Sequence, residues 1–228
     1  MHKIHRMGLL AAALVVSAGA SAYEAGDWNV RSGAVMVAPN DDSGSLELAG
    51  TALGGTGVQV DNSTQLLLNV TWMASDHMGI ELLAATPFEH KVDSAGLPGL
   101  GLGLSDVEVG SVKHLPPTLT VLWYPMDAGS AFQPFIGAGV NYTVFFQEDT
   151  SGAARTALGA RNLELDDSWG LAARAGFDYM LNDCWSLHAG VYYIGIDTQA
   201  ELDTALGKVG VDVDIDPWVY TVGLGYRF

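Results

Sequence analysis

Hydrophobic residues alternate with small or polar residues along most of the chain, and a period of two is the pattern of β-strands. Between 168 and 180, large apolar residues occupy one set of alternate positions, whereas Ser168, Arg174 and Asp178 fall on the other set. The pattern predicts eight strands, at 27–38, 64–75, 78–90, 115–124, 132–146, 168–180, 185–196 and 211–228. Alternation alone fits either a soluble sandwich with one wet face or a barrel in a membrane.

The lengths of the connections distinguish the two folds. Tight turns at 75–77, 125–131 and 181–183 alternate with much longer loops, which is typical of an outer-membrane barrel. We therefore expect an all-β fold, an eight-stranded antiparallel transmembrane β-barrel with long extracellular loops and short periplasmic turns, in the cell outer membrane. Aromatic residues occupy the short-turn ends, as an interfacial girdle requires: Trp28, Trp72, Trp123, Tyr179, Trp185, Tyr226 and Phe228.

The first 22 residues have the features of an export signal. Lys3 and Arg6 precede an apolar run at 7–16, and the small residues at 20–22 fit a cleavage site. The run is too short to cross a bilayer as a helix. We predict a cleaved signal peptide at 1–22 and one barrel domain at 23–228.

The charge of the chain limits its partners. Without the leader there are 8 basic and 26 acidic residues, a net charge of −18, which excludes nucleic acid as a partner. The single cysteine, Cys184, rules out an intramolecular disulfide. Acidic residues gather in the loops, where they could bind divalent cations that bridge lipopolysaccharide or form a solvated rim. We predict no metal site and no cofactor; His90 and His114 could meet near one loop, but a third ligand is lacking.

The side chains expected to point inward differ with height in the barrel. Towards the periplasm, Arg31 and Arg174 can pair with Glu81 and Asp178 in a polar plug. Towards the outside, the inward residues are apolar and are expected to form a ligand-lining cup. An apolar molecule would gain about 25 cal/mol per Å² on burial there, but crossing the plug would leave polar groups unsatisfied. The expected lining residues are Leu67, Leu83, Ala85, Phe145, Tyr192 and Ile194.

Three prolines lie near the expected outer ends of two neighbouring strands. Pro87, Pro116 and Pro117 cannot donate to a strand ladder, so the wall could open there and release a ligand sideways into the lipid. The alternative is that these prolines simply end their strands at the membrane surface.

The last strand and several internal stretches resemble a known family. The alternating C-terminus, with Tyr226 and the final Phe228, resembles the signal recognised by the outer-membrane assembly machinery. Further distinctive stretches are EAG at 24–26, GIELLAATPF at 79–88, HLPPT at 114–118, PFIGAGVNYT at 134–143, DSWG at 167–170 and DPWVYTVGLGYRF at 216–228. In these stretches the chain resembles the OmpW family, which includes AlkL-type proteins.

The resemblance implies a channel for passive uptake of small hydrophobic molecules, which enter from outside and leave laterally. The expected partners are outer-membrane lipid and lipopolysaccharide, the assembly machinery and small hydrophobic ligands. Two alternatives stay open, namely a structural or receptor protein, favoured if side chains fill the cup, and a narrow channel for small ions. We expect no enzyme, because the spacing of Ser43, Ser45, His90, Asp93 and His114 selects no catalytic triad.

Overall fold

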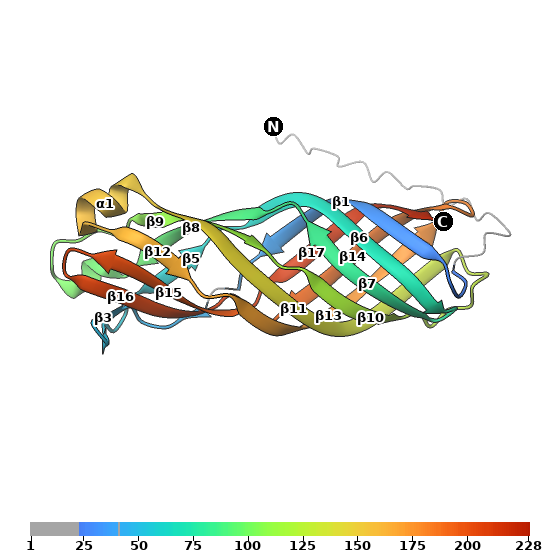
Figure 1. The fold of residues 1–228 in the computed structure, drawn as a ribbon, viewed down its shortest axis with the longest axis horizontal. Helices are drawn as coiled ribbons and strands as arrows, with labels where there is room; N and C mark the ends of the chain where they lie inside the picture. The colour runs from blue at the N-terminus through green and yellow to red at the C-terminus, as the bar shows by residue number, and fades with distance from the viewer. Residues whose placement is uncertain (1–22, 41) are drawn as a thin grey trace, which may run out of the picture.

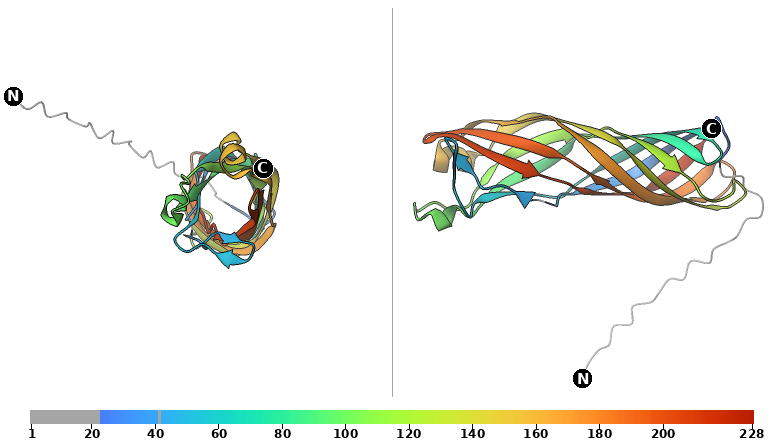
Figure 2. Two further views of the ribbon diagram at one scale, coloured as in Figure 1. Left: turned by 90° about the vertical axis from the view of Figure 1, so that its left-hand side faces the viewer. Right: turned by 90° about the horizontal axis from the view of Figure 1, so that it is seen from below.

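A long cylinder of antiparallel strands makes up the computed structural model of the chain, which describes residues 23–40 and 42–228 (Figure 1). The predicted signal peptide at 1–22 lies outside these residues. Viewed along its axis, the cylinder is a closed ring (Figure 2). No helix in the described ranges is long and apolar enough to cross a bilayer.

Eight strands form the closed barrel, which confirms the predicted fold class. In the hydrogen-bonded order β10-β7-β6-β1-β17-β14-β13-β11, the two end strands β10 and β11 also pair with each other and complete the ring. The three predicted tight turns join β6 to β7, β10 to β11 and β13 to β14 at the end of the cylinder where the C-terminus lies (Figure 1). The strands are β1 (Trp28–Ala38), β6 (Ser63–Ser75), β7 (Met78–Ala85), β10 (Thr118–Trp123), β11 (Phe132–Thr150), β13 (Ser168–Met180), β14 (Trp185–Ile194) and β17 (Trp218–Arg227).

The long connections are themselves largely strands, and they extend the cylinder beyond the barrel (Figure 1). The outer part of β11 continues into a sheet with β9 (Glu108–Leu115), β8 (Phe88–Ala95) and β5 (Gly57–Val60). A second sheet contains β12 (Arg161–Leu165), β15 (Asp197–Thr204), β16 (Gly207–Asp214), β3 (Glu47–Leu48) and β4 (Thr51–Ala52), with β2 (Asp42–Ser43) paired to β16. The 3₁₀ turn η1 (Leu97–Leu100) and the helix α1 (Gly152–Leu158) complete this part, which we call the extension.

Three of the predicted strands each divide into two in the structure. The segment 78–90 is interrupted at 86–87, 115–124 at 116–117 and 211–228 at 215–217. Each break contains at least one proline, which cannot donate to the ladder, so the barrel strand ends there and an extension strand takes a new direction. Period two continues on both sides of a break, which is why the pattern alone did not reveal it.

The alternation along the barrel strands divides an inner from an outer face as predicted. On β7, Leu82 is 45% exposed and its neighbour Leu83 is 3% exposed. The outward residues form an apolar band suited to lipid. At the short-turn end, Trp28 pairs with Trp72 across β1 and β6, and Phe228 donates its N–H to the carbonyl of Trp28 at 2.9 Å.

A repeated side-chain module marks the outer end of the barrel. The hydroxyl of Tyr142 donates to one carboxylate oxygen of Asp167 at 2.7 Å, and the backbone N–H of Phe145 donates to the other at 3.1 Å. The ring of Trp169 lies 4.4 Å from that of Tyr142. Asp167 therefore satisfies a backbone donor where β11 leaves the barrel.

The same arrangement recurs between β14 and β17. Asp216 accepts from the hydroxyl of Tyr193 at 2.9 Å and from the N–H of Ile196 at 3.1 Å, and Trp218 lies 5.2 Å from Tyr193. Trp169, Tyr193 and Trp218 are exposed and Tyr142 is half-buried, so the two modules give the barrel a second aromatic level, opposite the short-turn girdle.

We expect Leu82→Asp to impair folding, because it would place a carboxylate in the outward apolar band at a cost of about 1–3 kcal/mol, depending on depth in the bilayer. The folded fraction in lipid vesicles, measured from the faster-migrating band on unheated gels, should fall. Leu206→Asp makes the same change in the exposed turn between β15 and β16, and this control should fold normally. Equal folding of the two variants would contradict the assignment of the band to lipid.

Candidate functional site

A buried guanidinium lies at the centre of the barrel. Arg31 Nη1 donates to Glu81 at 2.8 Å and to Thr71 at 2.6 Å, while Nη2 donates to Asp178 at 2.6 Å and to the hydroxyl of Tyr124 at 3.0 Å. These partners come from β6, β7, β13 and the end of β10, so one side chain of β1 connects opposite walls. The planar guanidinium carries five donors, which suits such a site.

A second arginine completes the predicted polar plug. Arg174 forms an ion pair with Glu81, and its guanidinium carbon lies 4.4 Å from the centre of the Tyr192 ring. His188 Nδ1 lies 2.8 Å from Asp178 Oδ1. The structure thus brings together the four residues predicted for the plug, with two cationic and two anionic side chains fully buried side by side.

Aromatic residues close the barrel on the periplasmic side of the plug. The ring of Tyr23 lies 5.1 Å from that of Tyr124, which in turn lies 5.4 Å from that of Phe135. The hydroxyl of Tyr23 donates to Asp178 at 2.7 Å. Sequence reasoning missed this layer, since nothing local indicates that Tyr23, which precedes the first strand, folds back into the barrel.

The layer on the other side of the plug is filled rather than hollow. Leu67, Leu83 and Ile194, expected to line a ligand cup, are at most 3% exposed, and the space left here is about 10 Å³. Ala85 lies at the edge of this small space. Tyr192, also expected in the cup, belongs to the plug, because its hydroxyl donates to Glu81 at 2.7 Å. An eight-stranded barrel is only wide enough for its own side chains.

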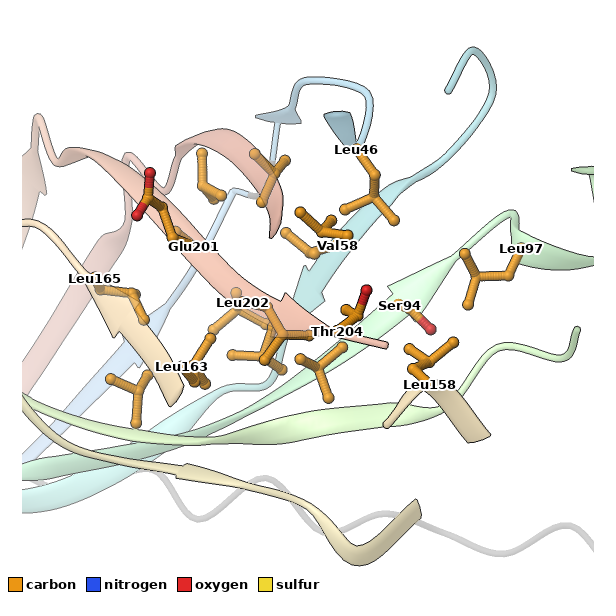
Figure 3. A pocket seen from close by; sticks show the side chains of 18 of the residues that line it. Leu46, Val58, Ser94, Leu97, Leu158, Leu163, Leu165, Glu201, Leu202 and Thr204 are labelled. Atoms are coloured by element: carbon orange, nitrogen blue, oxygen red, sulfur yellow. The ribbon is translucent and has the colours of Figure 1, made fainter. Parts of the chain in front are cut away.

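The large cavity lies further out, inside the extension (Figure 3). Its volume is about 580 Å³, within the usual range for small-molecule sites. Both extension sheets, η1 and α1 contribute to its wall, which is mainly leucine and valine. Phe145 is the one residue of the expected lining set that reaches it. Other lining residues include Leu46, Val58, Leu97, Leu158, Leu163 and Leu202.

The sequence carried one signal for this cavity. Val209, Val211 and Val213 occupy alternate positions at and just before the start of the strand predicted at 211–228, and all three line the cavity. The same period of two that indicated the barrel also indicated the extension. Which sheet faces which could not be inferred from it.

Two buried histidines interrupt the apolar wall. His90 Nε2 lies 3.0 Å from His114 Nε2, and His90 Nδ1 contacts the backbone carbonyl of Asp61. The rings of Phe88 and Phe145 lie 5.3 and 5.7 Å from that of His114. Burial, with a smaller effect of the neighbouring His90, lowers the pKa of His114 to about 3, so this imidazole is neutral at physiological pH.

The predicted doorway prolines lie where two neighbouring strand pairs are interrupted together. The β7–β10 ladder ends at Leu83 and Thr118, and the β8–β9 ladder begins at Phe88 and His114. In the described part of the chain, residues 84–87 and 115–117 form no ladder pair with each other. The prolines therefore end strands, as the simpler interpretation held, and they also leave a gap in the wall ladder.

The side chain of Phe88 lies beside this gap. Phe88 is 1% exposed and borders the small 10 Å³ space together with Pro116 and Ala85. It also contacts His114, which lines the large cavity. Phe88 thus lies between the cavity and the interrupted part of the wall.

The acidic loop residues form no metal-binding cluster of three or more groups within the described residues. Cys184 is exposed in the turn between β13 and β14. Asp167 and Asp216 instead serve the modules at the outer end of the barrel.

Comparison with known proteins gives consistent matches over the whole described chain. The profile of the OmpW family matches residues 24–228. Outer membrane protein W of Vibrio cholerae serotype O1 is 43% identical over 221 residues, 97% of each chain. The crystal structure of the outer membrane protein OprG from Pseudomonas aeruginosa has a TM-score of 0.85 and 45% identity, covering 92% of this chain and 99% of that one.

Two more distant relatives have other names. Outer membrane protein AlkL of Ectopseudomonas oleovorans is 27% identical, covering 92% of this chain and 86% of its own. The dibenzothiophene metabolism operon protein PahQ of Pseudomonas aeruginosa is 25% identical over 90% of each chain. The barrel and the relatives named as outer-membrane proteins together place this chain in the outer membrane, in contact with its lipid.

We expect Arg31→Met to destabilise the barrel by about 3–5 kcal/mol, because it would leave the buried carboxylates of Glu81 and Asp178 without their shared partner. The midpoint of urea unfolding in lipid vesicles should fall accordingly. Lys91→Met, which removes the exposed ion pair with Glu108, is the matched control and should change the midpoint far less. Similar shifts for the two variants would show that the plug does not hold the strands together.

Proposed function

The chain belongs to the OmpW family, and from that premise we propose that it mediates passive uptake of small hydrophobic molecules across the outer membrane. The observation that carries the proposal is the apolar cavity of about 580 Å³ at the end of the barrel opposite the short turns. A ligand that leaves water for this cavity gains about 25 cal/mol per Å² of buried apolar surface. The name of the relative PahQ, which refers to dibenzothiophene metabolism, is in keeping with an apolar ligand.

A route straight through the barrel is unfavourable for such a ligand. It would have to part Arg31 from Glu81 and Asp178 and leave these ions unpaired in an apolar interior. The filled layer of Leu67, Leu83 and Ile194 adds a steric barrier. We propose that the ligand leaves sideways, past Phe88, through the gap at Pro87, Pro116 and Pro117.

The same observations give less support to two other functions. The filled inner layer favours the structural or receptor alternative, but that alternative gives the large cavity outside the layer no role. A small-ion channel needs a hydrated path through the barrel. The side chains of the plug are fully buried and leave no such path at their level of the barrel. We also propose that the chain is not an enzyme, because the spacing of its loop serines, histidines and carboxylates selects no catalytic triad.

We expect Ala200→Trp to slow uptake of an apolar fluorescent tracer several-fold, because the indole would fill part of the cavity that Ala200 lines. The initial rate of tracer appearance in cells or in vesicles containing the protein measures this. Ala153→Trp, on the exposed face of α1, is the control and should transport normally. Unchanged uptake by a folded Ala200→Trp variant would rule out the cavity as the ligand site.

Replacing Pro116 with Thr and Pro117 with Val should slow tracer release into the membrane, because both new residues supply the N–H that the wall ladder lacks. Stability should hold or rise, measured by thermal unfolding. Phe88→Ala should act in the opposite direction and speed release. Pro98→Thr, in η1, is the control for removal of a proline elsewhere in the extension. If the double variant folds and transports at the normal rate, release does not occur at this gap.

A further inference from the structure

The two histidines in the cavity wall have a defined arrangement of protons. A backbone carbonyl can only accept, so His90 Nδ1 must carry the proton that it donates to Asp61. A neutral imidazole has one N–H, and burial among aromatic rings disfavours the charged form. His90 Nε2 is therefore an acceptor, and the 3.0 Å contact is a bond donated by His114 Nε2.

This chain of hydrogen bonds also determines the protonation of the other ring nitrogen of His114, Nδ1. With its proton on Nε2, His114 presents an unprotonated lone pair at Nδ1. That atom is buried and has no hydrogen-bond partner among the described residues. The same burial lowers the pKa of His114, which agrees with the neutral form. A buried acceptor without a partner is costly and rare in native proteins.

Resting on the function proposed above for the cavity, we propose that its preferred ligand is an amphiphile with a single hydrogen-bond donor, such as a long-chain alcohol or a phenol, whose O–H donates to His114 Nδ1. An alkane of equal length would leave this nitrogen unsatisfied. A ketone would bind more weakly than the alcohol, because its oxygen can only accept a hydrogen bond and so cannot pair with the acceptor Nδ1.

The position of His114 suits a ligand whose polar end lies next to the barrel. His114 is the last but one residue of β9, beside the barrel, and its neighbours are Phe88 and Phe145. Leucines from η1 and α1, among them Leu97 and Leu158, line another part of the cavity wall (Figure 3). A ligand that donates to Nδ1 would extend its apolar chain outward along these leucines.

The test uses three ligands of matched length, 1-decanol, 2-decanone and decane, with the protein in lipid nanodiscs. Dissociation constants are measured by competition against an apolar fluorescent probe and corrected for the partition of each ligand into lipid. We expect 1-decanol to bind about fivefold more tightly than 2-decanone, since one net hydrogen bond contributes about 1 kcal/mol. His114→Phe should remove this preference, whereas His77→Phe, in the short turn between β6 and β7, should keep it.

A second variant tests the proton arrangement itself. His90→Phe removes the acceptor that holds the proton on His114 Nε2, so the proton can move to Nδ1, which would then donate. We expect 2-decanone to gain affinity relative to 1-decanol in this variant. Loss of the alcohol preference without a gain for the ketone would overturn the proton arrangement.

Nitrogen-15 NMR of histidine-labelled wild-type protein provides a measurement that does not depend on variants. The His114 Nδ1 resonance should move on addition of 1-decanol and stay in place with decane, while both ligands shift the methyl signals of cavity leucines. Leucine shifts without an Nδ1 shift, or equal affinities for alcohol and ketone, would overturn this inference and leave the uptake proposal intact. If no ligand binds, the proposed function fails together with it.

Discussion

The lack of hydrogen-bond partners in a bilayer is the constraint on which this molecule depends. Every backbone N–H and C=O within the membrane must be paired by the protein itself, and strands achieve this only by closing into a ring. The pairing of β10 with β11 is the closing contact. Closure with eight strands then sets the width of the interior.

That width determines what the interior can hold. Side chains from all walls meet at the centre, so charged residues from distant strands form one paired cluster around Arg31, and the apolar residues beside it pack without a useful space. The barrel is therefore a closed structural support. A larger cavity has to form elsewhere, and it does so in the extension, where the wall separates into two sheets.

The boundary between barrel and extension combines two opposite local effects. At Asp167 and Asp216, carboxylates accept backbone donors as the strands leave the barrel, so these connections are firmly held. At Pro116 and Pro117, donors are missing and the ladder is interrupted. This boundary thus has both a reinforced and a weakened part, and Phe88 lies beside the weakened part.

The sequence by itself determined the features that depend on local periodicity and composition. Alternation predicted that Leu83 points inward and Leu82 outward. Loop lengths predicted which end of the barrel faces the outside. The grouping of the four charged plug residues followed from their inward direction. At Leu67, Leu83 and Ile194, where a cup was expected, the side chains fill the interior, because period two gives direction but not how far opposing side chains reach. Only the tertiary structure decided that Tyr23 closes the barrel, that the loops enclose the cavity, and that His90 and His114 contact each other through their Nε2 atoms. Each of these depends on contacts between residues far apart in the chain, to which a local pattern is insensitive.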